Sequence, residues 1–445
     1  MSSPHVLVIG SGPGGEAAAK RAAARGARVT LVEKGELGGV CLNRGCIPSK
    51  VLLEAGRLLS QARGAGAYMD GTLSVRWDEL QKKKSNIIAG LRNGLAAHLK
   101  KLGVEVLRGE ARFKDAHTVY VNGDEVAFDA AVVAAGSRPF LPEPFPAFRD
   151  GILDSDRVLS LPRIPKSLLV VGGGAVGCEF ACLFHELGSR VVLLEKMEDL
   201  LPGEDSAAVR VLRQAFEKRG LRVVAGSTVE RLSHEAVGWT ARLSTGEDLE
   251  AEEVLVCVGR RPSAENLGLE SAGVTLEKGR VPVNEFLKTS VASIYAVGDV
   301  NGISLLAHAA AAQAETAVDH YFGEKRTYDN SLVPRCLYTW PEVASVGEWT
   351  ANFQAKGIET KSQRFFFQGS PKALASNEAE GFIQVITEKK PDGLLLSAQI
   401  VGPHATELIH VFATALKARM TAAALRSVIF AHPTLSEGIR EALSR

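Results

Sequence analysis

The sequence contains one glycine-rich unit twice, and this duplication restricts the folds open to the chain more than any other feature. HVLVIGSGPGGEAAAKRAAARGARVTLVEK at residues 5–34 is matched by SLLVVGGGAVGCEFACLFHELGSRVVLLEK at residues 167–196. In each copy an apolar run precedes a G-x-G-x-x-G motif, and a second apolar run ends in a glutamate. The pattern predicts strand, glycine turn, helix and strand, so we expect an α/β protein with two Rossmann-like domains.

The glycine spacing in both copies is typical of dinucleotide binding. The first glycine permits a tight turn, the second lets the backbone approach a pyrophosphate, and the third lets the helix pack on the strand. The phosphates are expected at the N-terminal end of the helix and the glutamate at a ribose hydroxyl. A glycine-rich turn without a ligand is the alternative, but it would have to occur twice with the acid at the same distance. The residues are Gly10, Gly12, Gly15 and Glu33 in the first copy, and Gly172, Gly174, Gly177 and Glu195 in the second.

Two dinucleotide sites in one chain suggest an electron relay, with FAD as a resident group and a nicotinamide that comes and goes. The chain has 445 residues, for which two to four domains are expected. Its net charge of +1 argues against nucleic acid or an anionic membrane as the main partner. No apolar run is long enough to span a bilayer and no secretory signal is visible, so we expect a cytoplasmic location.

The remaining stretches give a coarser picture of the domains. Residues 76–103 predict a long amphipathic helix, and the proline-rich stretch 138–148 and residues 259–268 predict domain boundaries. From about residue 331, strands followed by helices near 405–418 and 434–444 predict an α+β domain. The apolar side chains of the long helix at helical spacing are Trp77, Leu80, Ile87, Leu91, Leu95, Leu99 and Leu102.

Cys41 and Cys46 lie close together in GGVCLNRGCIPSK, residues 38–50, which we expect to form a turn leading into a helix. The positive end of a helix lowers the pKa of a thiol, and a thiolate is the species that attacks a disulfide. A redox pair placed soon after the first glycine motif could lie against a flavin. Half of a zinc site and incidental buried thiols are the alternatives. Cys178 and Cys182, at i and i+4 of the second predicted helix, are expected to be core residues.

A substrate dithiol must lose a proton to react, and histidine is a suitable acceptor near neutral pH. His432 precedes a proline in FAHPTLSEGIREAL, and Glu437 follows it in the first turn of a helix expected to begin near residues 433–435. Glu437 could orient the imidazole, but Thr434 and Glu437 also have the spacing of a capping box. From spacing alone both interpretations stay open.

These motifs resemble the flavoprotein disulfide reductases, and among them the dihydrolipoyl dehydrogenases. The resemblance covers nearly the whole chain through both glycine units, the cysteine motif, VGRRP, TSVASIYAVGD, LLAHAA, YTWPEVASVG and HPTLSEG. It implies oxidation of protein-bound dihydrolipoyl groups and reduction of NAD, with FAD as cofactor and no metal. It also implies a homodimer that serves a lipoyl-bearing acyltransferase or glycine-cleavage carrier protein. The implied domains are 1–144 (FAD), 145–264 (NAD), 265–330 (central, completing the FAD site) and 331–445 (dimerisation).

The resemblance assigns roles residue by residue. Cys46 is implied to be the thiol beside the flavin and Cys41 the one that exchanges with substrate. His432 and Glu437 are implied to act as base and orienter from the opposite subunit, and Lys50 to pair with Glu179 near the reactive nitrogen of the flavin. The implied FAD residues are Gly10, Gly12, Gly15, Glu33, Lys50, Ala111, Gly136, Asp299 and Ala307, and the implied NAD residues are Gly172, Gly174, Gly177, Glu179, Glu195 and Gly259.

Other branches of the family differ at particular positions. The NADPH-dependent glutathione-type reductases carry arginines where this chain has Glu195 and Lys196, and a carboxylate there repels a ribose phosphate. Mercuric reductases end in a cysteine pair, and the flavin transhydrogenases lack the redox disulfide. Two alternative functions remain for the chain. It could be a reductase of another small disulfide, or a docking subunit without catalytic activity. It departs from the usual pattern at Ala135, Gln313, Ala314 and Gln384.

Overall fold

The computed structural model describes residues 3–66, 68–235 and 238–444. The chain divides into two compact units, each assembled from three stretches of sequence. The first unit contains Met1–Val51, Glu79–Phe140 and Gly259–Asn330, and the second contains Leu52–Asp78, Leu141–Val258 and Ser331–Arg445. The chain therefore leaves the first unit after Phe140 and returns to it at Gly259, inside the two stretches that the sequence predicts as boundaries.

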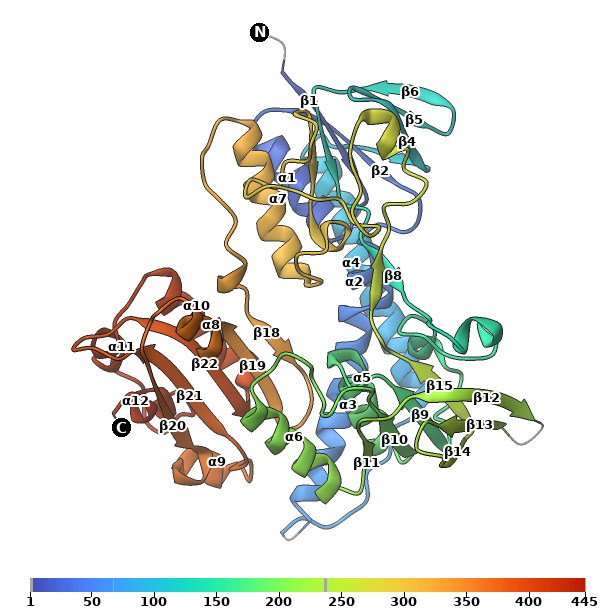
Figure 1. Cartoon of the computed structure of the whole chain (residues 1–445). Helices are drawn as coiled ribbons and strands as arrows, with labels where there is room; N and C mark the ends of the chain where they lie inside the picture. The colour runs from blue at the N-terminus through green and yellow to red at the C-terminus, as the bar shows by residue number, and fades with distance from the viewer. Residues whose placement is uncertain (1–2, 67, 236–237, 445) are drawn as a thin grey trace. The chain divides into compact units, whose positions relative to one another are not determined.

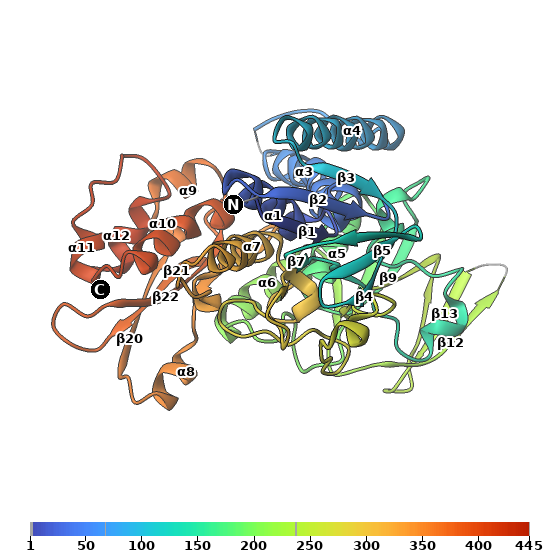
Figure 2. The ribbon, with the colours of Figure 1, turned by 90° about the horizontal axis from the view of Figure 1, so that it is seen from above.

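The first unit is a layered α/β structure around a parallel sheet with the strand order β17-β7-β1-β2-β3. β1, α1 and β2 are the strand, helix and strand predicted for the first glycine unit. Helices α1 and α7 lie side by side against one face of this sheet (Figure 1, Figure 2). Strands β4, β5 and β6 pack on its other face through side chains such as Phe113 and Val119. The helices and sheet strands are β1 (His5–Ile9), α1 (Pro13–Ala24), β2 (Arg28–Glu33), α2 (Gly39–Arg44), α3 (Cys46–Gly64, which continues into the second unit), α4 (Trp77–Lys101), β3 (Glu105–Arg108), β7 (Ala130–Val133), β17 (Ile294–Ala296) and α7 (Ala307–Tyr321).

Smaller elements of the first unit complete the sheet and its connections. Strand β17 pairs with β7 and forms the edge of the parallel sheet. A segment near residue 295 therefore belongs to the same sheet as β1, which lies near the N-terminus. The two connecting stretches pair with each other as antiparallel strands β8 and β16. These elements are β4 (Ala111–Asp115), β5 (Thr118–Val121), β6 (Asp124–Ala127), β8 (Ser137–Pro139), β16 (Arg260–Pro262), and the 3-10 turns η3 (Leu269–Ala272) and η4 (Gly298–Asn301).

The second unit contains the other glycine unit in a parallel sheet of order β11-β10-β9-β15. A three-stranded antiparallel sheet, β12-β13-β14, shares an apolar core with it through Leu169, Trp239 and Val254. The elements are β9 (Ser167–Val171), α5 (Ala175–Glu186), β10 (Arg190–Leu194), α6 (Ser206–Lys218), β11 (Arg222–Val224), β12 (Val229–Glu235), β13 (Gly238–Leu243), β14 (Asp248–Ala251) and β15 (Glu253–Val256).

The C-terminal part of the second unit is the predicted α+β arrangement. Its antiparallel sheet has the order β18-β19-β22-β21-β20, and α10 and α12 cover one face through an apolar core that includes Ile400 and Phe412 (Figure 1). The elements are β18 (Arg335–Leu337), β19 (Glu342–Gly347), α8 (Thr350–Ala355), β20 (Thr360–Phe366), α9 (Pro371–Ala375), β21 (Phe382–Glu388), β22 (Leu395–Gly402), α10 (Ala405–Lys417), α11 (Ala422–Arg426) and α12 (Glu437–Ala442).

The structure corrects two local expectations. The cysteine segment is not a turn, because Cys41 lies in the short helix α2 and Cys46 is the first residue of α3. Gly38 and Gly39 have φ of +95° and +59°, so the glycines make the bend that precedes α2 and leave the following residues helical. The last helix begins at Glu437 rather than near residues 433–435.

The buried face of α4 also differs from the expected stripe. The buried residues of this helix are Trp77, Lys84, Ile88, Leu95 and Leu99, which follow one another at helical spacing. Lys84 belongs to this row although it is not apolar. Leu91 and Leu102 are 47% and 37% exposed. Counting apolar residues overestimated the width of the stripe, since only one narrow row of a surface helix reaches the core.

Candidate active site

The first glycine motif forms a close-packed turn with one open position. A Cβ on Gly10 would lie 2.4 Å from the Ala134 carbonyl oxygen, and one on Gly15 would lie 1.7 Å from the Gly10 oxygen. At Gly12, the N-cap of α1, the nearest atom to a Cβ would be 4.0 Å away. The outer glycines are therefore needed for backbone packing, and Gly12 leaves space at the positive end of a helix. This is the cradle that a pyrophosphate requires.

The second motif repeats this arrangement at the N-terminus of α5. A Cβ on Gly172 would lie 2.5 Å from the Cys257 oxygen, and one on Gly177 would lie 1.8 Å from the Gly172 oxygen. At Gly174 no atom of the described residues comes within 4 Å of the position of a Cβ. Both sites thus fit a dinucleotide in the same way, as the sequence repeat predicts.

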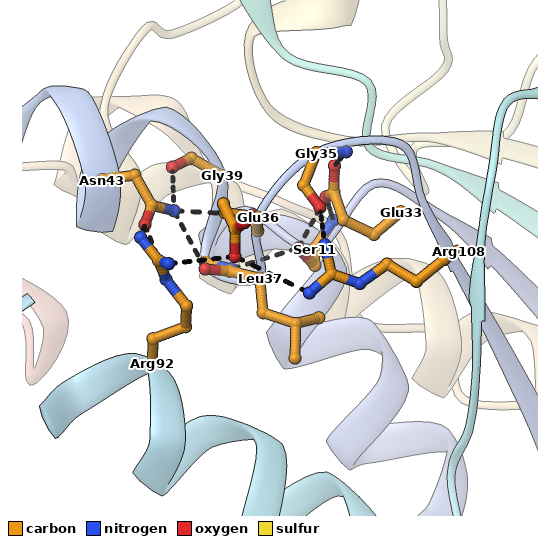
Figure 3. Close-up of polar contacts among 10 residues, drawn as sticks. Ser11, Glu33, Gly35, Glu36, Leu37, Gly39, Asn43, Arg92 and Arg108 are labelled. Carbon is orange, nitrogen blue, oxygen red and sulfur yellow. Dashed lines mark hydrogen bonds and ion pairs between the residues drawn. The ribbon is translucent and has the colours of Figure 1, made fainter. Parts of the chain in front are cut away.

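The two motif acids are held in equivalent positions. Glu33 accepts hydrogen bonds from the backbone N–H groups of Ser11 (2.8 Å) and Gly35 (2.7 Å), as Figure 3 shows. Glu195 accepts them from Gly173 (2.5 Å) and Met197 (2.8 Å). Each carboxylate is buried and uses one oxygen for each backbone group. A carboxylate can accept about four hydrogen bonds, so each retains capacity for a ribose hydroxyl.

We expect the two kinds of motif glycine to respond differently to alanine. Gly174→Ala should leave the melting temperature nearly unchanged and raise the KM for NAD at least about tenfold, because its methyl group occupies the cradle and nothing else. Gly177→Ala, its matched control, should destabilise the fold by about 1–3 kcal/mol or more, because the Cβ must displace backbone. Thermal unfolding and NAD titration of both variants check this, and equal melting temperatures would contradict the assignment.

No disulfide joins Cys41 and Cys46 in the structure, and the two side chains are in hydrogen-bond contact with each other. The hydrogen bond of the Cys41 thiol to Cys46, together with burial, raises the pKa of Cys41 well above its usual value. The positive charge of Lys50 acts in the opposite direction. At Cys41 this contact and burial oppose the lowering of the pKa that a helix end would give.

The cysteine segment lies against the first glycine motif. A Cβ on Gly39 would lie 2.7 Å from the Cα of Gly12, and the Ser11 hydroxyl accepts a hydrogen bond from the Gly38 N–H at 3.1 Å. The backbone that begins α2 is thus in contact with the predicted pyrophosphate cradle. Within the first unit, the structure brings the redox pair and the first dinucleotide site together.

Asp299, in η4, is held by two residues that the sequence did not single out. Its Oδ2 accepts a hydrogen bond from the Ser137 hydroxyl at 2.5 Å, and Arg260 Nε donates to that hydroxyl at 2.7 Å. Burial raises the pKa of Asp299, and the hydrogen bond from Ser137 opposes this. Gln313, one of the departures from the family pattern, accepts from the Gly298 N–H at 2.7 Å and so supports η4.

Four further FAD or NAD candidates lie at or beside element ends. Ala111 begins β4, Ala307 begins α7, and Gly136, with φ of +68°, directly precedes β8. Gly259, with φ of +127°, precedes β16. Gly136 and Gly259 follow the carboxyl ends of β7 and β15 and Ala307 starts a helix, positions where α/β proteins bind ligands, whereas Ala111 is a buried residue at the start of its strand.

His432 and Glu437 are in hydrogen-bond contact. The distance from His432 Nδ1 to Glu437 Oε1 is 2.9 Å, and the Thr434 N–H donates to the other carboxylate oxygen at 2.9 Å. Glu437 is thus placed to orient the imidazole, which stays a prediction, whereas the capping box is not formed because the helix begins at Glu437 itself and Ser436 is its N-cap. The Thr434 N–H and His432 lower the pKa of Glu437. The His432 side chain is 70% exposed, and binding through Nδ1 leaves Nε2 available to a substrate.

Glu179 lies in α5, is buried, and accepts a hydrogen bond from the Tyr338 N–H at 3.0 Å. Burial raises the pKa of Tyr338 to about 12. Lys50 lies in the first turns of α3 in the first unit. Its pairing with Glu179 stays a prediction.

The other cysteines have structural positions. Cys178 and Cys182 are buried in α5, as predicted for core residues, and burial raises the pKa of both, that of Cys182 to about 12. Cys257 directly follows β15 and is half-buried. Among the described residues, no group of three His, Cys, Asp or Glu side chains is arranged to hold a metal ion.

Sequence reasoning missed the residues that hold these groups. Ser11, Ser137, Arg260 and Tyr338 each contact a predicted site residue. Asn43 and Arg92, described below, contact the cysteine segment. Ser11, Asn43, Arg260 and Tyr338 lie inside motifs quoted above, so a signal was available for them, whereas Ser137 and Arg92 lie outside those motifs.

Comparison with known proteins identifies the family of the chain. The model of the pyridine nucleotide-disulphide oxidoreductases matches residues 4–314, and that of the dimerisation domain of the same family matches residues 333–443. The chain belongs to this family. The predicted family and fold class are confirmed. The helices of the described stretches include none that is both long and apolar enough to cross a bilayer.

Relatives in this oxidoreductase family match along nearly their whole length. The chain is 40% identical over 450 residues to the dihydrolipoyl dehydrogenase of Thermus scotoductus, covering 99% of this chain and 97% of the relative. It is 39% identical over 453 residues to the Bacillus subtilis enzyme of the same name, covering 98% and 97%. The crystal structure of LpdA from Mycobacterium tuberculosis has a TM-score of 0.92 at 27% identity, with 99% of each chain covered. The flavoprotein disulfide reductase RclA of Escherichia coli has a TM-score of 0.87 at 25% identity, covering 99% of each chain.

Proposed function

We propose that this chain is an NAD-dependent dithiol–disulfide oxidoreductase that oxidises dihydrolipoyl groups carried on proteins. The observation that carries the proposal is the Cys41–Cys46 pair, two thiols in contact with each other beside the open glycine motif at Gly12. The dihydrolipoyl dehydrogenases to which the chain is similar support the substrate class.

A bound FAD would supply two-electron transfer between the reduced cysteines and NAD. The residues proposed to hold it are those of the first motif with Glu33, together with Lys50, Ala111, Gly136, Asp299 and Ala307. The second motif, with Glu179, Glu195 and Gly259, is proposed to bind NAD. Each set contains an open glycine and a carboxylate held by backbone N–H groups, which fits a pyrophosphate and a ribose.

The thiol chemistry can be written with the chain's own residues. His432 of the partner subunit takes a proton from one thiol of the dihydrolipoyl group, and the resulting thiolate attacks the sulfur of Cys41. The Cys41–Cys46 bond breaks and Cys46 leaves as a thiolate. The second substrate thiol then displaces Cys41, which takes up a proton. The substrate becomes a disulfide, and two electrons with two protons have passed to the protein.

The assignment of His432 to a partner subunit rests on three observations. The histidine lies in the segment that matches the family's dimerisation domain. Its side chain is largely exposed in the single chain, and the neighbouring Ile429 is 94% exposed. Exposed apolar side chains beside a reactive group are typical of an interface. We therefore propose a homodimer whose partners are a lipoyl-bearing acyltransferase or a glycine-cleavage carrier protein, with a cytoplasmic location, where thiols stay reduced.

The deciding experiment is anaerobic reduction of NAD by free dihydrolipoamide, with NADP and glutathione as control substrates. Rapid NADH formation from dihydrolipoamide, and slow reaction in both controls, is expected. A yellow, dimeric preparation that fails with dihydrolipoamide would reject the substrate and direct the search to other small disulfides.

Glu195 is expected to determine the choice of nicotinamide. Glu195→Arg should lower kcat/KM for NAD relative to NADP by about 10–100-fold, because a carboxylate hydrogen bond worth about 1.5–3 kcal/mol is lost and a phosphate partner is gained. Glu198→Arg, on the exposed surface three residues away, is the matched control. An unchanged ratio in Glu195→Arg would mean that the ribose is recognised elsewhere.

A further inference from the structure

The segment between Glu33 and the redox cysteines is held by side chains from distant elements. Arg92 reaches it from α4 and Arg108 from β3, as Figure 3 shows. Neither arginine belongs to a motif. Both contact the six-residue helix α2 or the loop that leads into it. A helix this short is not stable by itself, so its position depends on such contacts.

Asn43, in α2, is the centre of this network. Its Nδ2 donates to the carbonyl oxygens of Leu37 and Gly39, both at 2.9 Å. Its Oδ1 accepts from Arg92 Nη2 at 2.7 Å and from Nε at 3.2 Å. The Asn43 amide therefore forms hydrogen bonds through both its nitrogen and its oxygen. Two nitrogens of the Arg92 guanidinium donate to the same Asn43 oxygen. This geometry fixes the rotation of the side chain and the direction of α2.

Glu36 closes the network on the outer side of the loop. Its Oε2 lies 3.0 Å from Arg92 Nη1 and 3.6 Å from Arg108 Nη2, and Arg108 Nη1 donates to the Gly35 carbonyl at 2.5 Å. On the inner side, Glu33 and Ser11 hold Gly35 and Gly38. The loop is therefore anchored on both sides immediately before Cys41.

We propose that Asn43 and Arg92 are positioning residues for the Cys41–Cys46 pair. Asn43 lies two residues after one cysteine and three before the other, so a rotation of α2 moves Cys41 relative to the start of α3. The partly exposed ion pairs contribute little to global stability. Their effect is geometric, because they keep the two sulfurs within reach of each other. The inference rests on the proposed redox role of the pair.

The consequence is a change in the thiol–disulfide equilibrium. When oxidised dithiothreitol reacts with the two thiols, the Cys41–Cys46 bond forms, the disulfide of the reagent breaks, and two electrons with two protons pass to the reagent. Loss of the anchor lowers the effective concentration of one sulfur at the other. We expect the equilibrium constant for disulfide formation to fall about tenfold in Asn43→Ala and severalfold in Arg92→Leu.

The experiment equilibrates the purified full-length protein anaerobically with graded ratios of reduced and oxidised dithiothreitol. After an acid quench and alkylation, mass spectrometry measures the oxidised fraction of the peptides that carry Cys41 and Cys46. Arg92→Lys should recover part of the equilibrium constant, since it retains the charge but not the two-nitrogen contact. Lys83→Leu, at an exposed position of the same helix, should match the wild type. Thermal unfolding checks that each variant is folded. If Asn43→Ala does not fold, the comparison of Arg92→Leu with the wild type decides the result.

Two outcomes are separable. An equilibrium constant that is unchanged or higher in Arg92→Leu would overturn the positioning role, while the redox role of the cysteines stands. A wild-type protein that forms no Cys41–Cys46 disulfide at any ratio would instead reject the proposed function. The readout requires neither dihydrolipoamide nor NAD, so failure of substrate turnover does not affect it.

Discussion

Cys46→Ser is expected to abolish dihydrolipoamide oxidation, with a loss on the order of 10⁴-fold or more, as when a reacting nucleophile is removed. Serine cannot form the disulfide that takes the electron pair, and its hydroxyl is far more difficult to ionise than a thiol. Cys41 should at the same time lose the feature that holds its proton, because the neighbouring sulfur is gone. We therefore expect faster alkylation of Cys41 in this variant than in the reduced wild type.

The measurements are NADH formation from dihydrolipoamide and the alkylation rate of Cys41 followed by peptide mass. Reduction of ferricyanide by NADH, which does not require the cysteines, serves as the control for an intact cofactor site. Cys336→Ser, at a half-buried cysteine of the second unit, is the matched control and should retain turnover. Turnover by Cys46→Ser within tenfold of the wild type would contradict the redox role.

His432→Gln is expected to slow dihydrolipoamide oxidation by about 10²–10⁴-fold, the usual contribution of a general base. Glutamine can keep a hydrogen bond to Glu437 but cannot take a proton from the substrate thiol. Glu437→Gln should have a smaller effect, because its remaining oxygen can still orient the ring through Nδ1 while the charge that favours the imidazolium is lost.

Steady-state rates against pH would check this prediction, since loss of the base should also remove the titration of a group near neutral pH from kcat/KM. His410→Gln, on the exposed side of α10 in the same sheet domain, is the matched control. Ferricyanide reduction by NADH should stay unchanged in all three variants. A near-normal rate in His432→Gln would leave its contact with Glu437 a purely structural one.

The features of this protein that could be predicted are those that depend on patterns within a short stretch of sequence. The two strand–glycine–helix–strand units, the acids Glu33 and Glu195, and the long helix α4 follow from glycine spacing and apolar periodicity within about 30 residues. The contact between His432 and Glu437 was one of two open possibilities for the same reason, since both residues lie within one turn of chain. Backbone conformation and short-range hydrogen bonds depend mainly on neighbouring residues, so a sequence pattern can express them.

Local patterns failed where a neighbour from elsewhere in the chain outweighed them. The rule that a helix end lowers the pKa of a thiol takes no account of the contact with Cys46, which together with burial raises the pKa of Cys41. The apolar stripe of α4 looked wide, but one narrow row reaches the core. Neither result contradicts the physical rule used. Each shows that burial and charge depend on what packs against a side chain.

The sequence by itself therefore determined the fold class and both glycine motifs, and it led to the proposal that Cys41 and Cys46 are the reactive sulfur pair. Only the tertiary structure decided which residues hold those groups. Asn43 and Arg92 are 49 positions apart, and Ser137 and Asp299 are 162 apart. Such contacts arise because sheet order and helix packing bring distant segments to one place, and no periodicity along the chain records which side chains will meet there.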